Sequence, residues 1–371
     1  MIKIGIVGTG MRAKAFKAGI DSMTDAAVTA VCDVSEKAVL SYSDLWKVKS
    51  YTDYIDMLDN EQLDAVIIST PVSIHVEQSV QALARNIHVY SEIPAAATIE
   101  ECKLLVEAAK KSRATYVLGE NMVYMKEYMT IANMIHDGLF GQVYYFLGEY
   151  LHDIKSFFEI SPWRKSLMAY KNGITYGTHS LAPMLIWMKD STIKKVLCVG
   201  SGHHYLDPVT GKPYIQENGC LMVCKTDSDC TIDIRVELMS TRPYSLNYRL
   251  QGTKGAYENY HDWTKSSSRI WIDQCSSGSS DEWQDFGICS YDYEPDIWKK
   301  LPKTLMEEST HWGVDIITMQ EWIAHLRGER PFAVDIYKAM DITLPGIIST
   351  QSIEQGGIWL DVPNSREWET Q

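Results

Sequence analysis

Long hydrophobic runs and an excess of positive charge are both missing from the sequence. The apolar stretches are short and broken by polar residues, so none reaches the ~20 residues that a transmembrane helix needs. The 35 Lys and Arg residues face 48 Asp and Glu residues, which gives a formal net charge of −13. We therefore expect neither nucleic acid nor an anionic membrane as a partner. A strand pattern starts within MIKIGIVG at the N-terminus, so no signal peptide is expected and the predicted location is cytoplasmic.

Paired cysteines and clustered metal ligands are missing as well. The chain has eight cysteines but no C-x-x-C, and Cys220, Cys224 and Cys230 lie in strand-like sequence. Structural zinc needs paired ligands at short spacing, so buried free thiols are the expected state. His203-His204 with Asp207 lacks a third ligand group of suitable spacing. No metal site is predicted.

The 371 residues are enough for two or three domains, and the first third has a regular rhythm. Short apolar strands alternate with segments of helical period, which is typical of a parallel sheet with helices on both faces. The expected strands are Ile2–Val7, Val28–Cys32, one within Gln62–Ser69, His88–Ser91 and Thr115–Gly119. The expected helices are Met11–Met23, Ser73–Arg85 and Ile99–Lys111.

The rhythm changes after a further expected helix at Tyr124–Gly138. Longer strands without intervening helices then indicate a mostly antiparallel, open sheet with one covered face. These are Val143–Tyr150, Ile193–Val199, Cys220–Lys225, Thr231–Met239 and Tyr248–Gln251, and helices at His311–Arg327 and Asp335–Gln355 follow. The predicted class is α/β plus α+β, with a doubly wound parallel domain at 1–121 and a second, substrate-binding and oligomerisation domain at 122–371.

A glycine motif follows the first strand and opens the first helix. Gly8-Thr9-Gly10-Met11-Arg12-Ala13 has the form G-x-G-x-x-A. The glycines permit a tight turn and close approach of a pyrophosphate, which the helix N-terminus would bind. Asp33 ends the second strand, 20 residues beyond Ala13, and can accept both hydroxyls of an adenosine ribose. A Rossmann domain that binds NAD(H) rather than NADP(H) is therefore predicted, because the carboxylate would repel a 2′-phosphate.

Two further loops follow expected strands and should line the cofactor. They contain Thr70-Pro71 and Glu92, since ligands collect at the carboxyl ends of parallel strands. His75 lies one turn into the next helix and is either a surface residue or a cofactor contact. Asn121 follows the last Rossmann strand and is suited to hydrogen-bond the nicotinamide or the substrate.

The second half carries residues suited to proton transfer. Tyr176 and His179 are three apart and would share one face of a helical turn. Imidazole has a pKa near working pH, so His179 could accept a hydroxyl proton while hydride leaves the carbon. His152 and Asp153 follow a strand, where Asp153 could orient His152, both could hold sugar hydroxyls, or the pair could form a plain loop turn. Arg164 beside Trp163 could clamp a polar substrate or form a surface ion pair.

The chain resembles the glucose–fructose oxidoreductase / inositol dehydrogenase / MocA (Gfo/Idh/MocA) family over essentially its whole length. The resemblance rests on Gly8-Thr9-Gly10, Ser69-Thr70-Pro71 with His75, Glu92-Ile93-Pro94, and Gly252-Thr253-Lys254-Gly255. It implies a Rossmann domain joined to an open sheet domain through which dimers or tetramers form. It also implies that Tyr176 and His179 lie at the nicotinamide.

Two departures point to a narrower group within that family. Many members have lysine where this chain has Ile93, and aspartate where it has Thr175. Both changes are found in NAD-dependent glycosidases similar to α-N-acetylgalactosaminidase. That group also resembles this chain at Glu92-Ile93-Pro94-Ala95-Ala96, Thr98-Ile99-Glu100-Glu101-Cys102, Glu120-Asn121, Glu149-Tyr150-Leu151-His152-Asp153, Trp163-Arg164 and Tyr176-Gly177-Thr178-His179.

Three functions are consistent with these residues. The first is an NAD-dependent oxidoreductase that oxidises a hydroxyl of a sugar or glycoside at C3. The second is a glycosidase that oxidises C3 transiently, eliminates the C1 substituent, adds water and reduces C3 again. The third is a non-catalytic dinucleotide sensor, against which Tyr176, His179 and His152 argue. Dehydrogenase and glycosidase share the first step, and the sequence does not separate them.

Overall fold

The computed structural model describes residues 1–161, 172–261, 266–273 and 282–369, which form two compact units. The first unit consists of Met1–Met125, Asp296–Met340 and Ser365–Gln371, and the second of Lys126–Pro295 and Asp341–Asn364. The sequence predicted one boundary near Asn121. In the structure the first unit also includes the two later segments, Asp296–Met340 and Ser365–Gln371.

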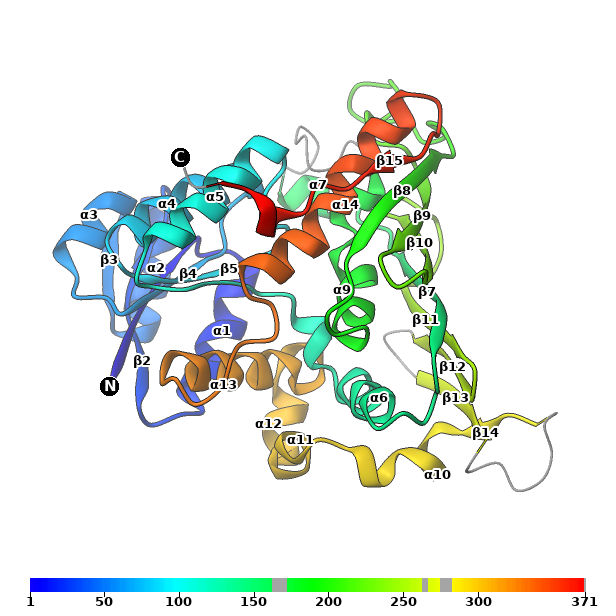
Figure 1. Cartoon of the computed structure of the whole chain (residues 1–371). Coiled ribbons are helices and arrows are strands. Elements are labelled where there is room, and N and C mark those ends of the chain that lie inside the picture. Colours follow the sequence, from blue (N-terminus) through cyan, green and yellow to red (C-terminus); the bar gives the residue numbers. More distant parts are fainter. Residues whose placement is uncertain (162–171, 262–265, 274–281, 370–371) are drawn as a thin grey trace. The chain divides into compact units, whose positions relative to one another are not determined.

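The first unit contains a sheet of six parallel strands in the order β3-β2-β1-β4-β5-β6 (Figure 1). Its strands are β1 (Ile2–Val7), β2 (Ala26–Cys32), β3 (Lys49–Tyr51), β4 (Ala65–Ile68), β5 (His88–Ser91) and β6 (Tyr116–Leu118). Its longer helices are α1 (Met11–Asp21), α2 (Glu36–Trp46), α3 (Tyr54–Asn60), α4 (His75–Ala84), α5 (Ile99–Lys111) and α13 (Val314–Leu326). Every residue of β4 is buried, as expected for a strand covered on both faces. The predicted doubly wound Rossmann sheet is confirmed.

Helix α13 belongs to this unit because it packs tightly on α1. Helices α1 and α13 lie on one face of the sheet, and α4 and α5 lie on the other (Figure 1). A side chain at Gly19 would come within 2.7 Å of Met319, so the glycine allows the two helices to approach. Trp322 is fully buried against Tyr90 of β5, with ring centroids 5.1 Å apart. Burial of these large rings explains why this late segment completes the first core. Short helices precede it at α11 (Asp296–Lys300) and α12 (Lys303–Glu308).

The second unit contains a sheet of nine strands in the order β14-β13-β12-β11-β7-β10-β9-β8-β15. Among the described residues of this second sheet, only β7 and β10 pair in parallel. The predicted mostly antiparallel sheet is therefore confirmed. The strands are β7 (Val143–Leu151), β8 (Ile193–Gly200), β9 (Gly219–Thr226), β10 (Thr231–Glu237), β11 (Ser245–Gly252), β12 (Gly255–His261), β13 (Ser266–Ile272), β14 (Gln284–Asp285) and β15 (Leu360–Asp361). The helices are α6 (Lys126–His136), α7 (Phe157–Ile160), α9 (Thr178–Trp187), α10 (Phe286–Ser290) and the later part of α14 (Ile336–Glu354).

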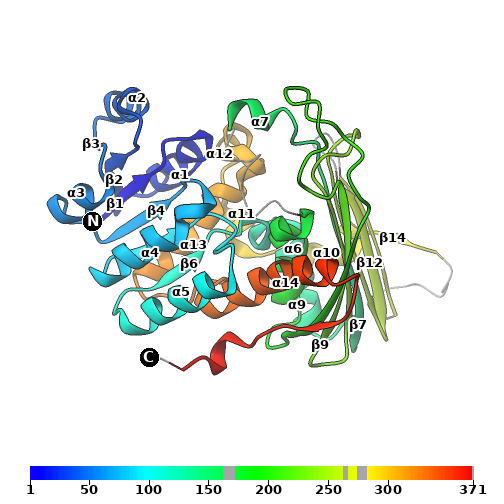
Figure 2. The same ribbon diagram turned by 90° about the horizontal axis from the view of Figure 1, so that it is seen from above.

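The two faces of this second sheet differ. Helices α6, α9 and α14 lie against one face (Figure 2). In β10, Ile232, Ile234 and Val236 are buried, whereas Arg235 between them is exposed. This period-2 alternation is typical of a sheet with one covered face.

No helix among the described residues is long and apolar enough to cross a membrane. Within the same residues, no group of three or more His, Cys, Asp or Glu side chains is arranged to hold a metal ion. Cys32, Cys102, Cys198, Cys220, Cys224 and Cys230 are buried and free.

Candidate functional site

The turn between β1 and α1 is shaped to accept a dinucleotide. Gly8 has φ +89°, and a Cβ there would lie 2.6 Å from the backbone oxygen of Ser69, so only glycine fits. At Gly10 a Cβ would meet nothing within 4 Å, which leaves the backbone open to a ligand. No side chain caps α1 and no acidic residue lies in its first turn. A bare helix N-terminus with open space beside it fits a pyrophosphate.

Asp33 is held in place at the end of β2 before any ligand is considered. One carboxylate oxygen, Oδ2, accepts the N–H and the hydroxyl of Thr9, both at 2.8 Å. The other, Oδ1, accepts the N–H of Ser35 at 2.9 Å. The residue that sequence reasoning assigned to the adenosine ribose is thus tied directly to the glycine turn.

Replacing Asp33 with alanine is expected to weaken NAD binding by about 10- to 100-fold, because hydrogen bonds to a charged group would be lost. The preference over NADP should fall at the same time, since no carboxylate would then oppose the 2′-phosphate. Titration of the purified protein with each nucleotide measures both effects. Asp44→Ala is a matched control, because Asp44 is exposed on α2. Equal or tighter binding of NADP by the unaltered protein would contradict the assignment.

The loops after β4 and β5 are joined by a buried histidine. His75 is 2% exposed, with Nδ1 3.1 Å from the carbonyl of Pro94 and Nε2 2.8 Å from that of Thr70. Burial lowers the pKa of its imidazole. The Thr70 hydroxyl donates to Gln78 at 2.6 Å. His75 therefore braces the Thr70-Pro71 loop that was predicted to line the cofactor, and both of its ring nitrogens face backbone carbonyls.

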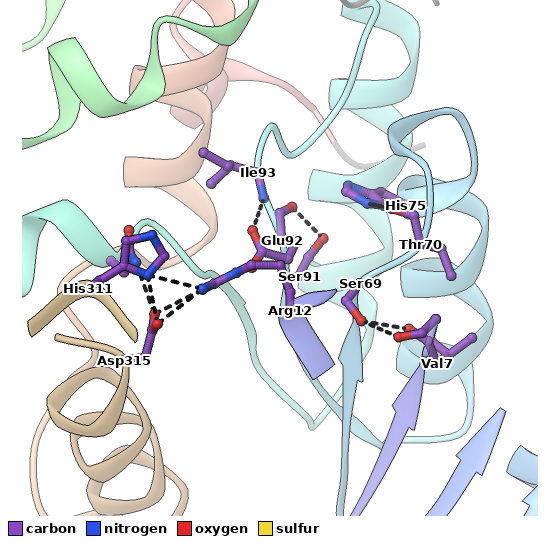
Figure 3. Close-up of polar contacts among 12 residues, drawn as sticks. Val7, Arg12, Ser69, Thr70, His75, Ser91, Glu92, Ile93, His311 and Asp315 are labelled. Carbon is purple, nitrogen blue, oxygen red and sulfur yellow. Dashed lines mark hydrogen bonds and ion pairs between the residues drawn. The ribbon is translucent and has the colours of Figure 1, made fainter. Parts of the chain in front are cut away.

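Arg12, Glu92, Asn121, His311 and Asp315 form a polar cluster in the first unit, here called the Arg12 network. Figure 3 shows Arg12, Glu92, His311 and Asp315 of this network. Arg12 Nε donates to Glu92 at 2.7 Å, and Arg12 Nη2 and Nη1 donate to the two oxygens of Asp315 at 2.9 and 3.1 Å. Asn121 Nδ2 donates to Asp315 at 3.0 Å. Arg12 thus joins Glu92 to Asp315, which also binds Asn121; Asp315 was not among the predicted residues.

The electrostatics of this network keep its charges fixed. Burial by itself would raise the pKa of Asp315, but the charge of Arg12 and hydrogen bonds from His311 and Arg12 hold it well below its usual range. For Arg12, burial opposes the charged form, while Glu92 and Asp315 raise the pKa well above its usual value. Both groups are therefore ionised at any working pH.

His311 reaches the network on an unusual loop. His311, Trp312 and Gly313 have φ of 52°, 54° and 90°, three consecutive residues in the left-handed region. The sequence predicted that a helix starts at His311, but α13 begins only at Val314. This left-handed turn brings His311 Nδ1 to 2.8 Å from Asp315. Such backbone strain in non-glycine residues is often found at functional sites.

In the second unit, five aromatic and imidazole rings pack together and are here called the ring cluster: Tyr150, His152, Tyr176, His179 and Tyr244. The Tyr176 and His179 ring centroids lie 5.5 Å apart and perpendicular to each other. Tyr150 lies 5.3 Å from His179 and 5.8 Å from His152. The three residues predicted to be catalytic are thus neighbours, joined by Tyr150.

The local structure of the ring cluster differs from the single helical turn that was predicted. Tyr176 ends a 3-10 turn, Gly173–Tyr176, whose first N–H groups are capped by Asn172. His179 is the second residue of α9, and its carbonyl accepts the Tyr248 hydroxyl. Burial lowers the pKa of His152, while a hydrogen bond to the backbone of Asp153 and the charge of Asp153 act in the opposite direction. A neutral His152 can accept a proton at pH 7.

Asp153 has a nearby partner of its own. Its carboxylate accepts the N–H of Lys155 at 3.1 Å and pairs with Lys155 Nζ at 3.1 Å. Lys155 Nζ also donates to the carbonyl of Met239 at 2.7 Å. Asp153 therefore anchors the loop after β7. Trp163 and Arg164, predicted to bind substrate, lie outside the described residues.

Tyr150 and Tyr244 were not among the predicted site residues. For Tyr150 a signal existed, because it precedes His152 by two residues and strand period places both on one side of the sheet. Tyr244 is close to His152 in space, with ring centroids 5.2 Å apart, although 92 residues separate them. No local pattern could have indicated that contact.

Comparison with known proteins agrees with these features. Residues 2–120 match the oxidoreductase family with an NAD-binding Rossmann fold, GFO_IDH_MocA. Residues 2–120 are therefore similar to the NAD-binding domain of the Gfo/Idh/MocA oxidoreductases, as the sequence predicted. Residues 206–368 match the C-terminal domain of glycosyl hydrolase 109, which agrees with the predicted resemblance to NAD-dependent glycosidases.

Individual relatives cover nearly the whole chain. A "Glycosyl hydrolase family 109 protein" of Saccharopolyspora erythraea is 26% identical, over 100% of this chain and 84% of its own length. The WlbA dehydrogenase from Bordetella pertussis, solved with NADH and UDP-GlcNAcA, is similar in fold (TM-score 0.76, 17% identity, 98% of this chain and 99% of that chain). Levoglucosan dehydrogenase with NADH and levoglucosan is likewise similar (TM-score 0.78, 16% identity, 98% of this chain and 99% of that one).

Proposed function

We propose that this protein oxidises the C3 hydroxyl of a sugar or glycoside by hydride transfer to NAD⁺, with His179 and Tyr176 handling the proton. The observation that carries the proposal is the ring cluster, in which His179, Tyr176 and His152 meet within one compact unit. A sensor needs no such set of proton-transfer groups. The ligands of the similar dehydrogenases, UDP-GlcNAcA and levoglucosan, support a sugar as the substrate class.

In the proposed reaction the protein supplies a base and a second side chain that hydrogen-bonds to the reacting hydroxyl. His179 accepts the hydroxyl proton while the C3 hydrogen leaves as hydride. Tyr176, perpendicular to the imidazole, holds the same hydroxyl and can relay its proton. His152, whose pKa is lowered by burial, supplies a further imidazole beside them.

When bound, NAD⁺ would supply the acceptor for the hydride and could return the hydride to the same carbon. The glycine turn at Gly8 and Gly10, with the helix start at Met11, would hold the pyrophosphate, and Asp33 would hold the adenosine ribose. Thr70, Pro71 and Glu92 would line the rest of the dinucleotide.

A glycosidase cycle is the second candidate, and the match of residues 206–368 to glycosyl hydrolase 109 favours it. A C3 ketone acidifies the C2 proton, which a base removes; the C1 substituent then leaves as the aglycone. Water adds at C1, a proton returns to C2, and hydride returns to C3. The net change is hydrolysis without consumption of NAD. His152 is the proposed base for C2, because it is the second imidazole of the ring cluster.

A panel of glycosides with chromogenic aglycones tests both candidates at once. NADH absorbance and released aglycone are followed in the same reaction. Accumulating NADH without aglycone indicates a dehydrogenase, and aglycone release without net NADH indicates the glycosidase. Dinucleotide binding with neither signal on any member of the panel would support the sensor and overturn the proposal.

We further propose a homo-oligomer, a dimer or tetramer, that forms through the uncovered face of the second sheet. Val199 and Leu221 are paired neighbours on that face and are 45% and 43% exposed. Leu221 also pairs with Arg235, which forms an ion pair with Glu149 at 3.4 Å. Apolar residues beside paired charges suit a self-complementary interface. Light scattering at micromolar concentration should give at least a dimer, and a monomer would contradict this.

A further inference from the structure

Arg12 lies in the first turn of α1, the helix end that would face a bound pyrophosphate. Its guanidinium, however, binds two carboxylates. Nε binds Glu92, and Nη1 and Nη2 form a bidentate pair with Asp315 (Figure 3). The Asp315 side chain is 2% exposed and that of Glu92 is 15% exposed. The Arg12 side chain is 30% exposed, but its bidentate pair with a buried carboxylate fixes its geometry, so Arg12 stays with the two carboxylates rather than with a phosphate.

The charges of the Arg12 network do not cancel. Arg12 contributes one positive charge, and Glu92 and Asp315 contribute two negative charges, which leaves −1. His311 Nδ1 lies 2.8 Å from Asp315 Oδ2 and 3.3 Å from Arg12 Nη1; because a carboxylate only accepts, the shorter contact puts a hydrogen on Nδ1. In its neutral form His311 adds no charge to the network. Asn121 adds a donor but no charge.

The topology places this charge in the nicotinamide half of the Rossmann sheet. The strand order reverses between β1 and β4, and a dinucleotide lies across the carboxyl ends at that point. Asp33, at the end of β2, marks the adenosine half. Glu92 follows β5 and Asn121 follows β6, in the other half. The network is therefore on the side of the sheet where the redox-active ring binds.

We propose that the net negative Arg12 network makes the protein prefer NAD⁺ over NADH. Glu92 and Asp315 supply the negative charge and need not touch the cofactor. The oxidised nicotinamide carries a positive charge that the reduced ring lacks, so a fixed negative charge nearby stabilises only the oxidised form. The preference keeps the cofactor ready to accept hydride between turnovers. The inference rests on NAD as cofactor and on no particular sugar.

Separate titrations with NAD⁺ and NADH measure the preference as a ratio of dissociation constants, Kd(NADH)/Kd(NAD⁺). The protein is first stripped of bound nucleotide and kept at pH 8.5, which favours neutral imidazole. Asp315→Asn and Glu92→Gln each remove one negative charge and preserve shape. We expect each to lower the ratio by about tenfold, the order expected for one charge across a few ångströms of protein. For the two-electron couple, tenfold corresponds to about 30 mV.

Two controls separate this charge effect from damage to the fold. ADP-ribose lacks the nicotinamide, so its affinity shows how far each variant damages the rest of the cofactor site. Such damage weakens NAD⁺ and NADH binding equally and therefore cancels in the ratio of their dissociation constants. Asp59→Asn removes an exposed carboxylate that pairs with Arg85 in the same unit and should leave the ratio unchanged. Should Asp315→Asn fail to fold, Glu92→Gln carries the test alone.

An unchanged ratio in Glu92→Gln would overturn the proposal, as would an unchanged ratio in a folded Asp315→Asn. Failure of the proposed sugar chemistry would have a different signature. In that case no glycoside would turn over, while the ratio would still fall in both variants. The two conclusions can therefore fail independently.

Discussion

Hydride transfer is expected to fall by about 10²- to 10⁴-fold in His179→Ala, the usual cost of removing a general base. NAD binding should stay nearly unchanged, because the residues assigned to the cofactor belong to the first unit and His179 to the second. Single-turnover reduction of NAD⁺ on a substrate found by the glycoside panel measures the first quantity, and nucleotide titration measures the second. His136→Ala is the matched control, since His136 is exposed on α6 in the same unit.

Tyr176→Phe refines the assignment. This variant should lower the rate of hydride transfer less than His179→Ala does if the phenol only positions the hydroxyl. It should lower the rate as much if the phenol carries the proton. The two losses should not add in the double variant, because rings 5.5 Å apart act on one proton as a unit. Near-full single-turnover activity of His179→Ala would make His179 structural. The base would then have to be His152 or Tyr176, and Ile93 offers no lysine in their place.

The sequence predicted most of the first sheet because its signals are local. A strand, a glycine turn and a helix are adjacent in the chain, and each has its own period. The edge strand β3 and its neighbours α2 and α3 were not anticipated. β3 has only three residues, Lys49–Tyr51, and pairing with β2 rather than propensity makes it a strand. The serine-rich start of β13 was likewise not predicted as a strand. Serine is not among the residues enriched in strands, and pairing with β12 makes the segment a strand.

The site was predicted where the partners are close in sequence. The spacing of Tyr176 and His179 correctly brought the rings together, although a 3-10 turn followed by α9 does so instead of one helix. Asp315 was missed because it meets Arg12 across 303 residues. The pattern around His311 also reads as continuous helix, and no propensity anticipates a left-handed Trp312. Contacts that depend on tertiary packing leave no local signal.

Gly148→Ala should impair catalysis although it touches no reacting group. Gly148 lies in β7, two residues before Tyr150, and a Cβ there would lie 2.4 Å from the backbone oxygen of Ser180 and 2.7 Å from Met184 Cε. A backbone oxygen cannot turn aside, so the added methyl must push α9 away from the sheet. His179 precedes Ser180 and would move with it, changing its 5.3 Å spacing from Tyr150.

Hydride transfer in Gly148→Ala is therefore expected to fall by about 10²-fold, the cost of misplacing a catalytic group by roughly 1 Å. The overpacked contact should also lower the free energy of unfolding by about 1–3 kcal/mol. Affinity for NAD should be retained, which separates this effect from a damaged cofactor site. Gly287→Ala is the control, because Gly287 is exposed and its nearest neighbour is only the end of the Asp285 side chain. Turnover and thermal unfolding that match the unaltered protein would show that the close approach of α9 to β7 is not what holds His179 beside Tyr150.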